Sequence, residues 1–247
     1  MERNRGLLVE FVGLPAAGKT TVASALERRL TETLATGADD GEPRVTTSTG
    51  KRDGIRLSAV GKLVAMQFCS APVRSVRSLV HLVRSGQKSV TKLPRYYLYQ
   101  LYVCEELRRA IDEDEIHLAD QGFLQHLWRV HLTSTREGTE AIGRLLLDQY
   151  PALEPDVVVF VTVDHRTRMD RGNERGTPVD DELYDPNHPA IQADRDAYRE
   201  LKELVSSLAD EEGREIRTIE IDNEAELLDA NTSAATTLIC DELASQA

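Results

Sequence analysis

The chain has 247 residues, of which 40% are hydrophobic and 29% charged, a composition typical of a soluble globular protein with a substantial core. No apolar run is long enough to cross a membrane, and the first apolar segment begins too early to leave room for a signal peptide, so we expect a cytoplasmic protein. The net charge of −12 argues against general nucleic-acid binding, although residues 51–104 contain ten basic residues and one acidic residue.

Residues 7–21 combine a short apolar run with the pattern Gly-x4-Gly-Lys-Thr. We predict a strand over 7–12 and a helix over about 18–34, joined by a phosphate-binding P-loop; the alternative is a glycine turn that only ends a strand. The glycines let backbone N–H groups point at a phosphate, and the helix N-terminus adds to the positive field. In this interpretation Lys19 neutralises the β- and γ-phosphates and the Thr20 hydroxyl binds Mg²⁺. The expected nucleotide-binding residues of this loop are Gly13, Leu14, Pro15, Ala16, Ala17, Gly18, Lys19, Thr20 and Thr21.

The segment that follows the first helix is less regular. Residues 36–43 form a turn cluster and 44–49 a β-branched strand, followed by amphipathic helices over 55–90 that break near Pro72 and Gly86. One long helix is expected over 93–112. Its tyrosines are interpreted as packing residues rather than as a platform on which bases stack: Tyr96, Tyr97, Tyr99 and Tyr102.

A short apolar strand over 116–120 ends in Asp120, about 100 residues after Lys19. An acidic residue at this point of a P-loop protein can contact Mg²⁺ or accept a proton from an attacking hydroxyl. It can also cap the N-terminus of the next helix, and the two roles are compatible. That helix is expected to run through Trp128 to about Leu132, with a second helix over 138–149.

Residues 155–164 form the clearest buried strand, because their near-continuous apolar character suits a parallel sheet covered on both faces. An arginine-rich helix and loop follow over 166–176, where Arg168, Arg171 and Arg175 recur at helical spacing and share one face. A row of guanidinium groups can close over phosphates as a lid. Alternatively, these arginines are solvated or pair with acidic neighbours.

The remaining chain completes an alternating pattern of strands and helices. A helix is expected over about 190–210, a strand over 217–221 and a last helix from about 224. This order predicts a single α/β domain over 1–247, with a doubly wound parallel sheet that binds ligands at the carboxyl ends of its strands.

Taken together, these motifs resemble thymidylate kinase and its nucleoside monophosphate kinase and deoxynucleoside kinase relatives. The resemblance lies in the P-loop, the strand ends Asp120-Gln121-Gly122 and Val163-Asp164, the Arg-x-x-Arg-Gly segment at 168–172, and the strand that runs into Ile221-Asp222-Asn223. It implies a five-stranded parallel sheet of order 2-3-1-4-5, ATP as the phosphoryl donor, and Mg²⁺. It also implies an adenine site formed by Arg168 with Asp222 and Asn223, a lid over about 165–190, and a basic helical acceptor region over about 51–110.

The chain departs from thymidylate kinases where they bind their acceptor. There the strand-end acid is followed by an arginine that holds the acceptor's phosphate, whereas this chain has Gln121. A Glu-Pro-Gly type segment after the second strand is also not visible, unless the Thr-Gly-Lys-Arg sequence at 49–52 is its remnant. The acceptor contacts of thymidylate kinase therefore do not carry over, and the acceptor could be a nucleoside, a nucleotide, a sugar or a lipid alcohol.

The favoured function is an ATP-dependent small-molecule kinase, and the alternative is a regulatory P-loop ATPase that controls a partner. A switch GTPase is disfavoured because the base-reading motif Asn-Lys-x-Asp does not occur. The expected partner is a small-molecule acceptor. The basic residues of 51–104 could bind a phosphorylated acceptor, lie against an anionic membrane surface, contact a protein or form a solvated face, and a homodimer is left open. The expected catalytic residues are Lys19, Asp120, Arg168, Arg171 and Arg175, with Thr20 and Asp120 as metal ligands.

Overall fold

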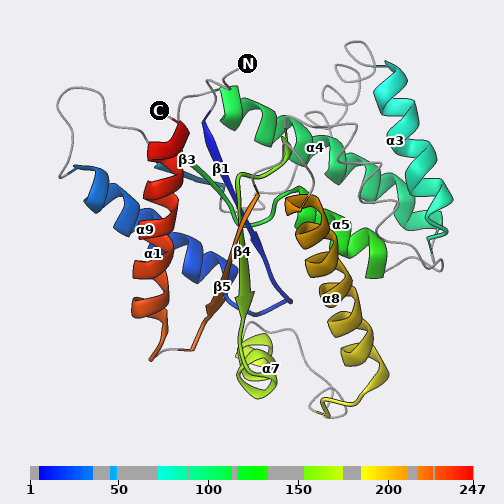
Figure 1. Ribbon diagram of the computed structural model, residues 1–247. Coiled ribbons are helices and arrows are strands. Elements are labelled where there is room, and N and C mark those ends of the chain that lie inside the picture. The colour runs from blue at the N-terminus through cyan, green and yellow to red at the C-terminus, as the bar shows by residue number, and fades with distance from the viewer. Residues whose placement is uncertain are drawn as a thin grey trace.

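The computed structural model describes most of the chain in nine stretches (Figure 1). These are residues 6–35, 45–48, 72–87, 90–112, 116–132, 153–174, 185–210, 216–224 and 226–246. The helix expected over 138–149, the turn cluster over 36–43 and the candidate lid residue Arg175 lie outside them. All that follows concerns the described residues.

The centre of the molecule is a five-stranded sheet of order β2-β3-β1-β4-β5 in which every strand pair is parallel. This confirms the predicted fold class and strand order. The strands are β1 (Leu7–Val12), β2 (Val45–Ser48), β3 (Ile116–Ala119), β4 (Val157–Thr162) and β5 (Arg217–Asp222). Since β1 is buried along its whole length and β4 nearly so, both need the continuous apolar sequences that predicted them.

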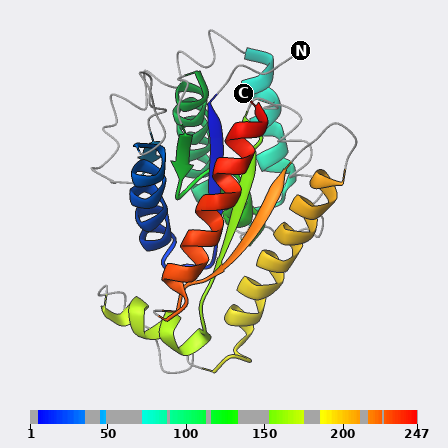
Figure 2. The same cartoon turned by 60° about the vertical axis from the view of Figure 1, so that its left-hand side comes forward.

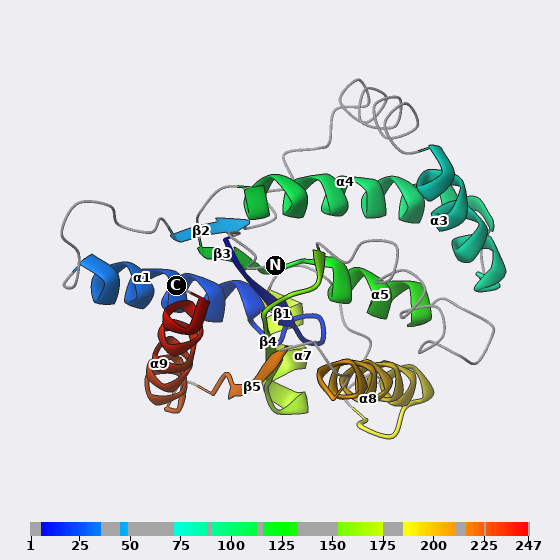
Figure 3. The same cartoon turned by 45° about the horizontal axis from the view of Figure 1, so that its top comes forward.

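Helices cover both faces of this sheet (Figures 2 and 3). On one face α1 (Lys19–Ala35) and α9 (Leu228–Gln246) pack against the side chains of Leu7, Val9 and Phe11. On the other face lie α4 (Leu93–Asp112), α5 (Phe123–Leu132) and α8 (Pro189–Ala209). The alternation of side chains along β1 divides the core into these two halves.

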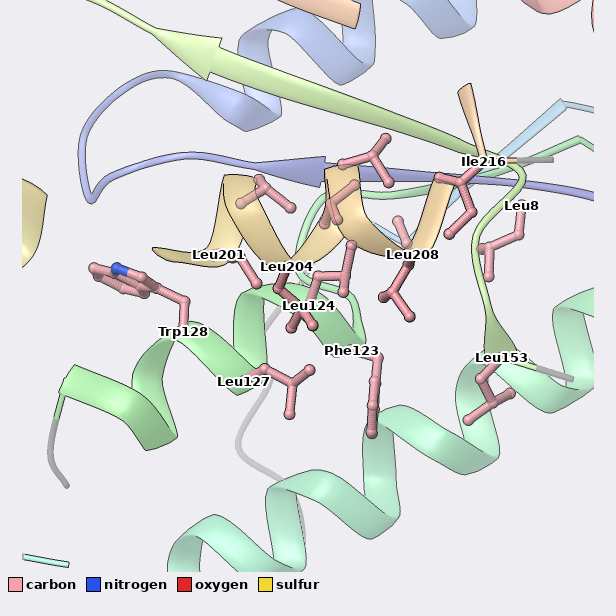
Figure 4. Packing of buried hydrophobic residues seen from close by; sticks show 14 of the residues in the cluster. Leu8, Phe123, Leu124, Leu127, Trp128, Leu153, Leu201, Leu204, Leu208 and Ile216 are labelled. Atoms are coloured by element: carbon pink, nitrogen blue, oxygen red, sulfur yellow. The ribbon is translucent and has the colours of Figure 1, made fainter. Parts of the chain in front are cut away.

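The second half of the core joins α8 to α5 and to the sheet (Figure 4). Leu201, Leu204 and Leu208 of α8 pack with Leu124 and Leu127 of α5, and all five are almost completely buried. Burial of each such side chain contributes roughly 1.5–3 kcal/mol to the free energy of unfolding. The packing holds α5 in place directly after the strand end at Asp120.

Two further helices lie outside these layers. The first, α3 (Pro72–Arg84), packs on α4 through the small cluster of Leu82, Tyr97 and Leu101. A short 3-10 turn, η1 (Val90–Lys92), leads into α4. In Figure 1, α7 (His165–Glu174) lies beyond the carboxyl ends of β4 and β5, where the site is built. Within the part of the chain that the structure describes, no helix is long and apolar enough to cross a membrane.

Element boundaries differ from the predicted ones by a few residues, for local reasons. The strand predicted over 155–164 runs only from Val157 to Thr162; before its start the Asp156 carboxylate, rather than a backbone carbonyl, accepts the hydrogen bond of Leu8 N at 2.8 Å. The last helix begins at Leu228 rather than near 224, because Glu224 O first accepts hydrogen bonds from Leu227 N and Leu228 N in a turn. α3 begins at Pro72 and ends at Arg84, two residues before the break predicted near Gly86, whereas the helix expected before Pro72 lies outside the described residues.

Candidate nucleotide-binding site

The P-loop connects β1 to α1 through a tight turn in which Ala17 N donates to Leu14 O at 3.1 Å. Gly18 has a φ of 86°, and a Cβ atom there would lie 2.0 Å from the Asn223 side chain, so only glycine fits. Ala16 has a φ of 63° in the same left-handed region, which costs an alanine on the order of 1 kcal/mol. The loop therefore keeps two residues in the left-handed region, a backbone conformation that occurs in anion-binding loops.

Lys19 is the first residue of α1, and its ammonium group folds back over the loop. Its Nζ donates to Gly13 O at 2.8 Å and to Leu14 O at 3.3 Å. The side chain is thus held at the rim of the loop, next to the amides that would receive a phosphate. An anion bound there would compete with these neutral carbonyls for the ammonium group, and an ion pair between opposite charges is stronger than a hydrogen bond to a neutral acceptor.

Thr20 and Asp120 are 100 residues apart in the chain and meet at the carboxyl end of the sheet. The Thr20 hydroxyl donates to Asp120 Oδ2 at 2.7 Å. Asp120 is 2% exposed, and its second oxygen, Oδ1, is buried without a hydrogen-bond partner. A buried carboxylate oxygen without a partner is costly, and a cation or a donated proton would satisfy it.

These two residues fit a hard divalent cation by the chemistry of their donors. Hydroxyl and carboxylate oxygens are ligands that Mg²⁺ prefers, and Mg²⁺ usually takes only one or two from the protein and the rest from phosphates and water. Among the described residues, no group of three or more His, Cys, Asp or Glu side chains could hold a metal ion by itself. The arrangement thus suits a cation that arrives with a phosphate.

A buried chain of hydrogen bonds, which we name the Glu10–Gln125–Gly13 relay, was not predicted from the sequence and links β1 to the P-loop. Glu10 Oε1 accepts a hydrogen bond from Gln125 N at 3.0 Å, and the Gln125 side chain accepts one from Gly13 N at 3.2 Å. Gly122 has no room for a Cβ atom, which would lie 2.3 Å from the Glu10 carboxyl carbon. Burial raises the pKa of Glu10 to about 8, although backbone hydrogen bonds from the start of α5 lower it. A lone acid in the apolar run Leu7–Val12 was the available signal for it.

The opposite side of the P-loop is supported by β5 and α7. Asn223 is 3% exposed, and its Nδ2 donates to Ala17 O at 2.7 Å. Arg171 of α7 donates to Asn223 O at 3.1 Å and to Ala17 O at 3.5 Å. Asp222, the last residue of β5, accepts from the Asn231 side chain through its backbone carbonyl. Of the predicted nucleotide-binding residues of this region, Asn223 is therefore the one whose side chain contacts the P-loop.

The predicted arginine row divides between two kinds of contact. Arg168 is buried and pairs with Asp194 of α8 at 3.7 Å, with a further contact to His165 at 3.3 Å. Its neighbour Arg171 contacts the P-loop instead, and Arg175 lies outside the described residues. Asp164 caps α7 by accepting from Thr167 N at 3.0 Å, the capping role that its position after the strand predicts.

Directly after Asp120, Gln121 joins α4 to α5. Its Oε1 accepts from the Tyr99 hydroxyl at 3.2 Å and from Arg129 at 3.4 Å, while the Arg129 guanidinium lies 5.6 Å from the Tyr99 ring centre. His126 lies against the same ring, and burial lowers its pKa to about 3, so that it is neutral. The tyrosines interpreted as packing residues are not equivalent, because Tyr97 is buried in a cluster whereas Tyr99 also contacts Gln121.

Comparison with known proteins shows the fold. No family model matches the chain, and no curated protein matches it. Among solved structures, a thymidylate kinase from Candida albicans aligns over 98% of this chain and 93% of that chain, with a TM-score of 0.50 and 14% sequence identity. Its structure is described as revealing the origin of broad substrate specificity and a novel structural element. At 14% identity the similarity shows the fold alone: the chain has the P-loop kinase fold, with a parallel sheet of order 2-3-1-4-5.

Proposed function

We propose that this protein transfers the γ-phosphoryl group of ATP to a hydroxyl or phosphate group of a small-molecule acceptor. The observation that carries the proposal is the 2.7 Å contact between Thr20 and Asp120 at the end of a P-loop. It places a hydroxyl and a buried carboxylate, the two groups expected to bind Mg²⁺, beside the phosphate-binding amides. Because the donor is ATP, a cytoplasmic location belongs to the same proposal.

Each described residue of the site has a role in this reaction. Backbone amides at Gly18 and at the start of α1 bind the β-phosphate, and Lys19 leaves the loop carbonyls to neutralise the transferring group. The bound cation would supply charge neutralisation between the phosphates, held by Thr20 and Asp120. Asp120 also has a free carboxylate oxygen that can accept the proton of an attacking hydroxyl.

Arg171 is the lid arginine that we assign to the phosphates. Its guanidinium already lies at the P-loop through Ala17 O and Asn223 O, where it would add positive charge as negative charge spreads over the transferring oxygens. Arg168 is buried against Asp194 and thereby holds α7 against α8. We propose that Arg168 supports the lid through its ion pair with Asp194 and that Asn223 lies beside the adenine base of ATP.

The test is ATP turnover in the presence of acceptors, followed as ADP release. A panel of nucleosides, nucleotides, sugars and lipid alcohols should contain a compound that stimulates ADP release and becomes phosphorylated. Lys19→Ala should then lower kcat/KM by about 10²–10³-fold, because it removes a charge that stabilises the transition state. The matched control is Lys202→Ala on α8, whose ammonium group pairs with Glu220 of β5 rather than with the loop and whose loss should leave turnover unchanged.

Asp120→Asn distinguishes catalysis from capping. It should keep ATP binding but lower kcat by at least about 10²-fold, because the amide neither accepts a proton nor binds Mg²⁺ well. Equal loss of folding and of binding would point to a structural cap. ADP release that no acceptor increases would contradict a kinase and favour the ATPase alternative.

A further inference from the structure

The apolar side of α3 faces outward, away from the rest of the protein. Val73, Val76, Val80 and Val83 are 73%, 51%, 42% and 55% exposed. Their spacing of three, four and three residues places them in one row along the helix. We name this row, together with the half-exposed Leu79 beside it, the α3 stripe.

The inward side of α3 is polar and small instead. Ser75, Ser78 and Ser85 are 1% or less exposed, and Leu82 is the only buried apolar side chain among the described ones of this helix. Tyr97 of α4 donates to the Ser75 carbonyl at 3.1 Å, and Leu82 packs with Tyr97 and Leu101. A helix that only covers the protein turns its apolar side inward, so the reversed arrangement of α3 needs another explanation.

The charges around the α3 stripe have one sign. Residues 72–104 contain six basic residues and no acidic residue, in a chain with a net charge of −12. Arg77 and Arg84 are exposed and lie along one flank of the stripe by helical spacing. Burial and the neighbouring arginines lower the pKa of His81, a further ionisable group on this flank. Figures 1 and 3 show α3 at the edge of the molecule, beside α4 and away from the sheet.

We propose that α3 binds an anionic lipid surface, with the α3 stripe in the boundary between headgroups and acyl chains and Arg77 and Arg84 at the lipid phosphates. An apolar row beside arginines is the pattern of helices that lie in a membrane interface. A lipid surface is uniformly anionic, which matches the single sign of charge over 72–104. A protein partner fits less well, because a stripe on a 13-residue helix is far smaller than the roughly 800 Å² that a stable interface buries per partner.

The experiment is co-sedimentation of the full chain with vesicles of phosphatidylcholine alone or mixed with phosphatidylglycerol. Binding is expected only to the vesicles with phosphatidylglycerol, and it should weaken as salt is added. Arg77→Glu/Arg84→Glu should weaken binding by at least about 30-fold, since each basic residue near an anionic surface contributes about fivefold. The control Arg195→Glu/Arg199→Glu changes the net charge equally at exposed residues of α8 and should retain binding.

The apolar part of the proposal is tested in both directions. Val76→Asp/Val80→Asp should abolish sedimentation, and Val76→Leu/Val80→Leu, which carries little risk to folding, should tighten binding by about fourfold per added methylene. Failure of the wild type to bind phosphatidylglycerol vesicles would overturn the proposal. Unchanged affinity of the leucine variant would also overturn it. If the wild type does not bind vesicles but forms a dimer that the aspartate variant disrupts, the α3 stripe is an interface between two copies of the chain, and the proposal is again overturned.

Discussion

Glu10 places an ionisable group inside the sheet, and its titration must affect stability. Its carboxyl group is fully buried, with one oxygen bonded to Gln125 N and the other without a partner. Burial raises its pKa in the folded protein to about 8, from 4.5 in an exposed carboxyl group. Between these two values the folded state binds more protons than the unfolded state, so the free energy of unfolding falls as pH rises.

Glu10→Gln should remove this dependence. Wild-type stability should decline from about pH 5 to about pH 8, by up to about 1.4 kcal/mol per pH unit, and level off above that range. The glutamine keeps an oxygen for Gln125 N but does not ionise, so the decline should be smaller in the variant. Urea unfolding at a series of pH values measures it, and Glu27→Gln on α1 is the surface control. Parallel profiles for wild type and Glu10→Gln would contradict the prediction.

Single residues of the site were predictable where a motif names them. Lys19 and Thr20 follow from the P-loop pattern, and Asp120 from its position at a strand end. The structure brings Thr20 and Asp120 into contact, as their proposed common ligand requires. Gln125 had no such signal, because a glutamine in a helix shows its contact with Gly13 N only after the helix has packed on the sheet.

At the scale of elements, α7 is connected to two parts of the protein by two arginines three residues apart. Arg171 contacts the P-loop, and Arg168 pairs with Asp194 of α8. Helical spacing predicts that these side chains share a face, but spacing does not say which element each one meets. That choice depends on where the P-loop and Asp194 lie around α7 in the fold, and both are far from it in the sequence or on another helix.

Asp194→Asn should loosen the attachment of α7 to α8. Arg168 would remain buried with a weaker partner, and the free energy of unfolding should fall by about 2–3 kcal/mol. Asp196→Asn is the matched control, because its partner Arg199 is largely exposed and the loss should be about 0.5 kcal/mol or less. Chemical denaturation measures the free energy of unfolding of both variants. Equal losses would show that the Arg168–Asp194 pair contributes no more to stability than the exposed Arg199–Asp196 pair.

At the scale of the whole molecule, the site is assembled from both halves of the chain. β1, β3, β4 and β5 all end at one edge of the sheet, and the P-loop, Asp120, Arg171 and Asn223 meet there. A ligand bound at that edge contacts elements from across the fold and should stabilise the fold as a unit.

ATP with Mg²⁺ should therefore raise the melting temperature. At 100 times its Kd the nucleotide adds about 2.7 kcal/mol, which corresponds to about 5–10 °C for a protein of this size. Removal of Mg²⁺ with a chelator should reduce the increase in the wild type and have little further effect in Asp120→Asn. Thermal unfolding followed by fluorescence measures it. An increase that is the same in Lys19→Ala would show that the nucleotide binds elsewhere.

The sequence by itself determined the elements, the P-loop and the order of the sheet. The elements, the P-loop and the parallel sheet depend on periodicity, glycine positions and the alternation of strands with helices, which are local patterns. The strand order followed from the resemblance of the motifs to the thymidylate kinase family. The tertiary structure alone decided the Glu10–Gln125–Gly13 relay, the different partners of Arg168 and Arg171, and the outward direction of the α3 stripe. Each of these depends on which faces of distant segments come together, and a side chain has no partner until that packing exists.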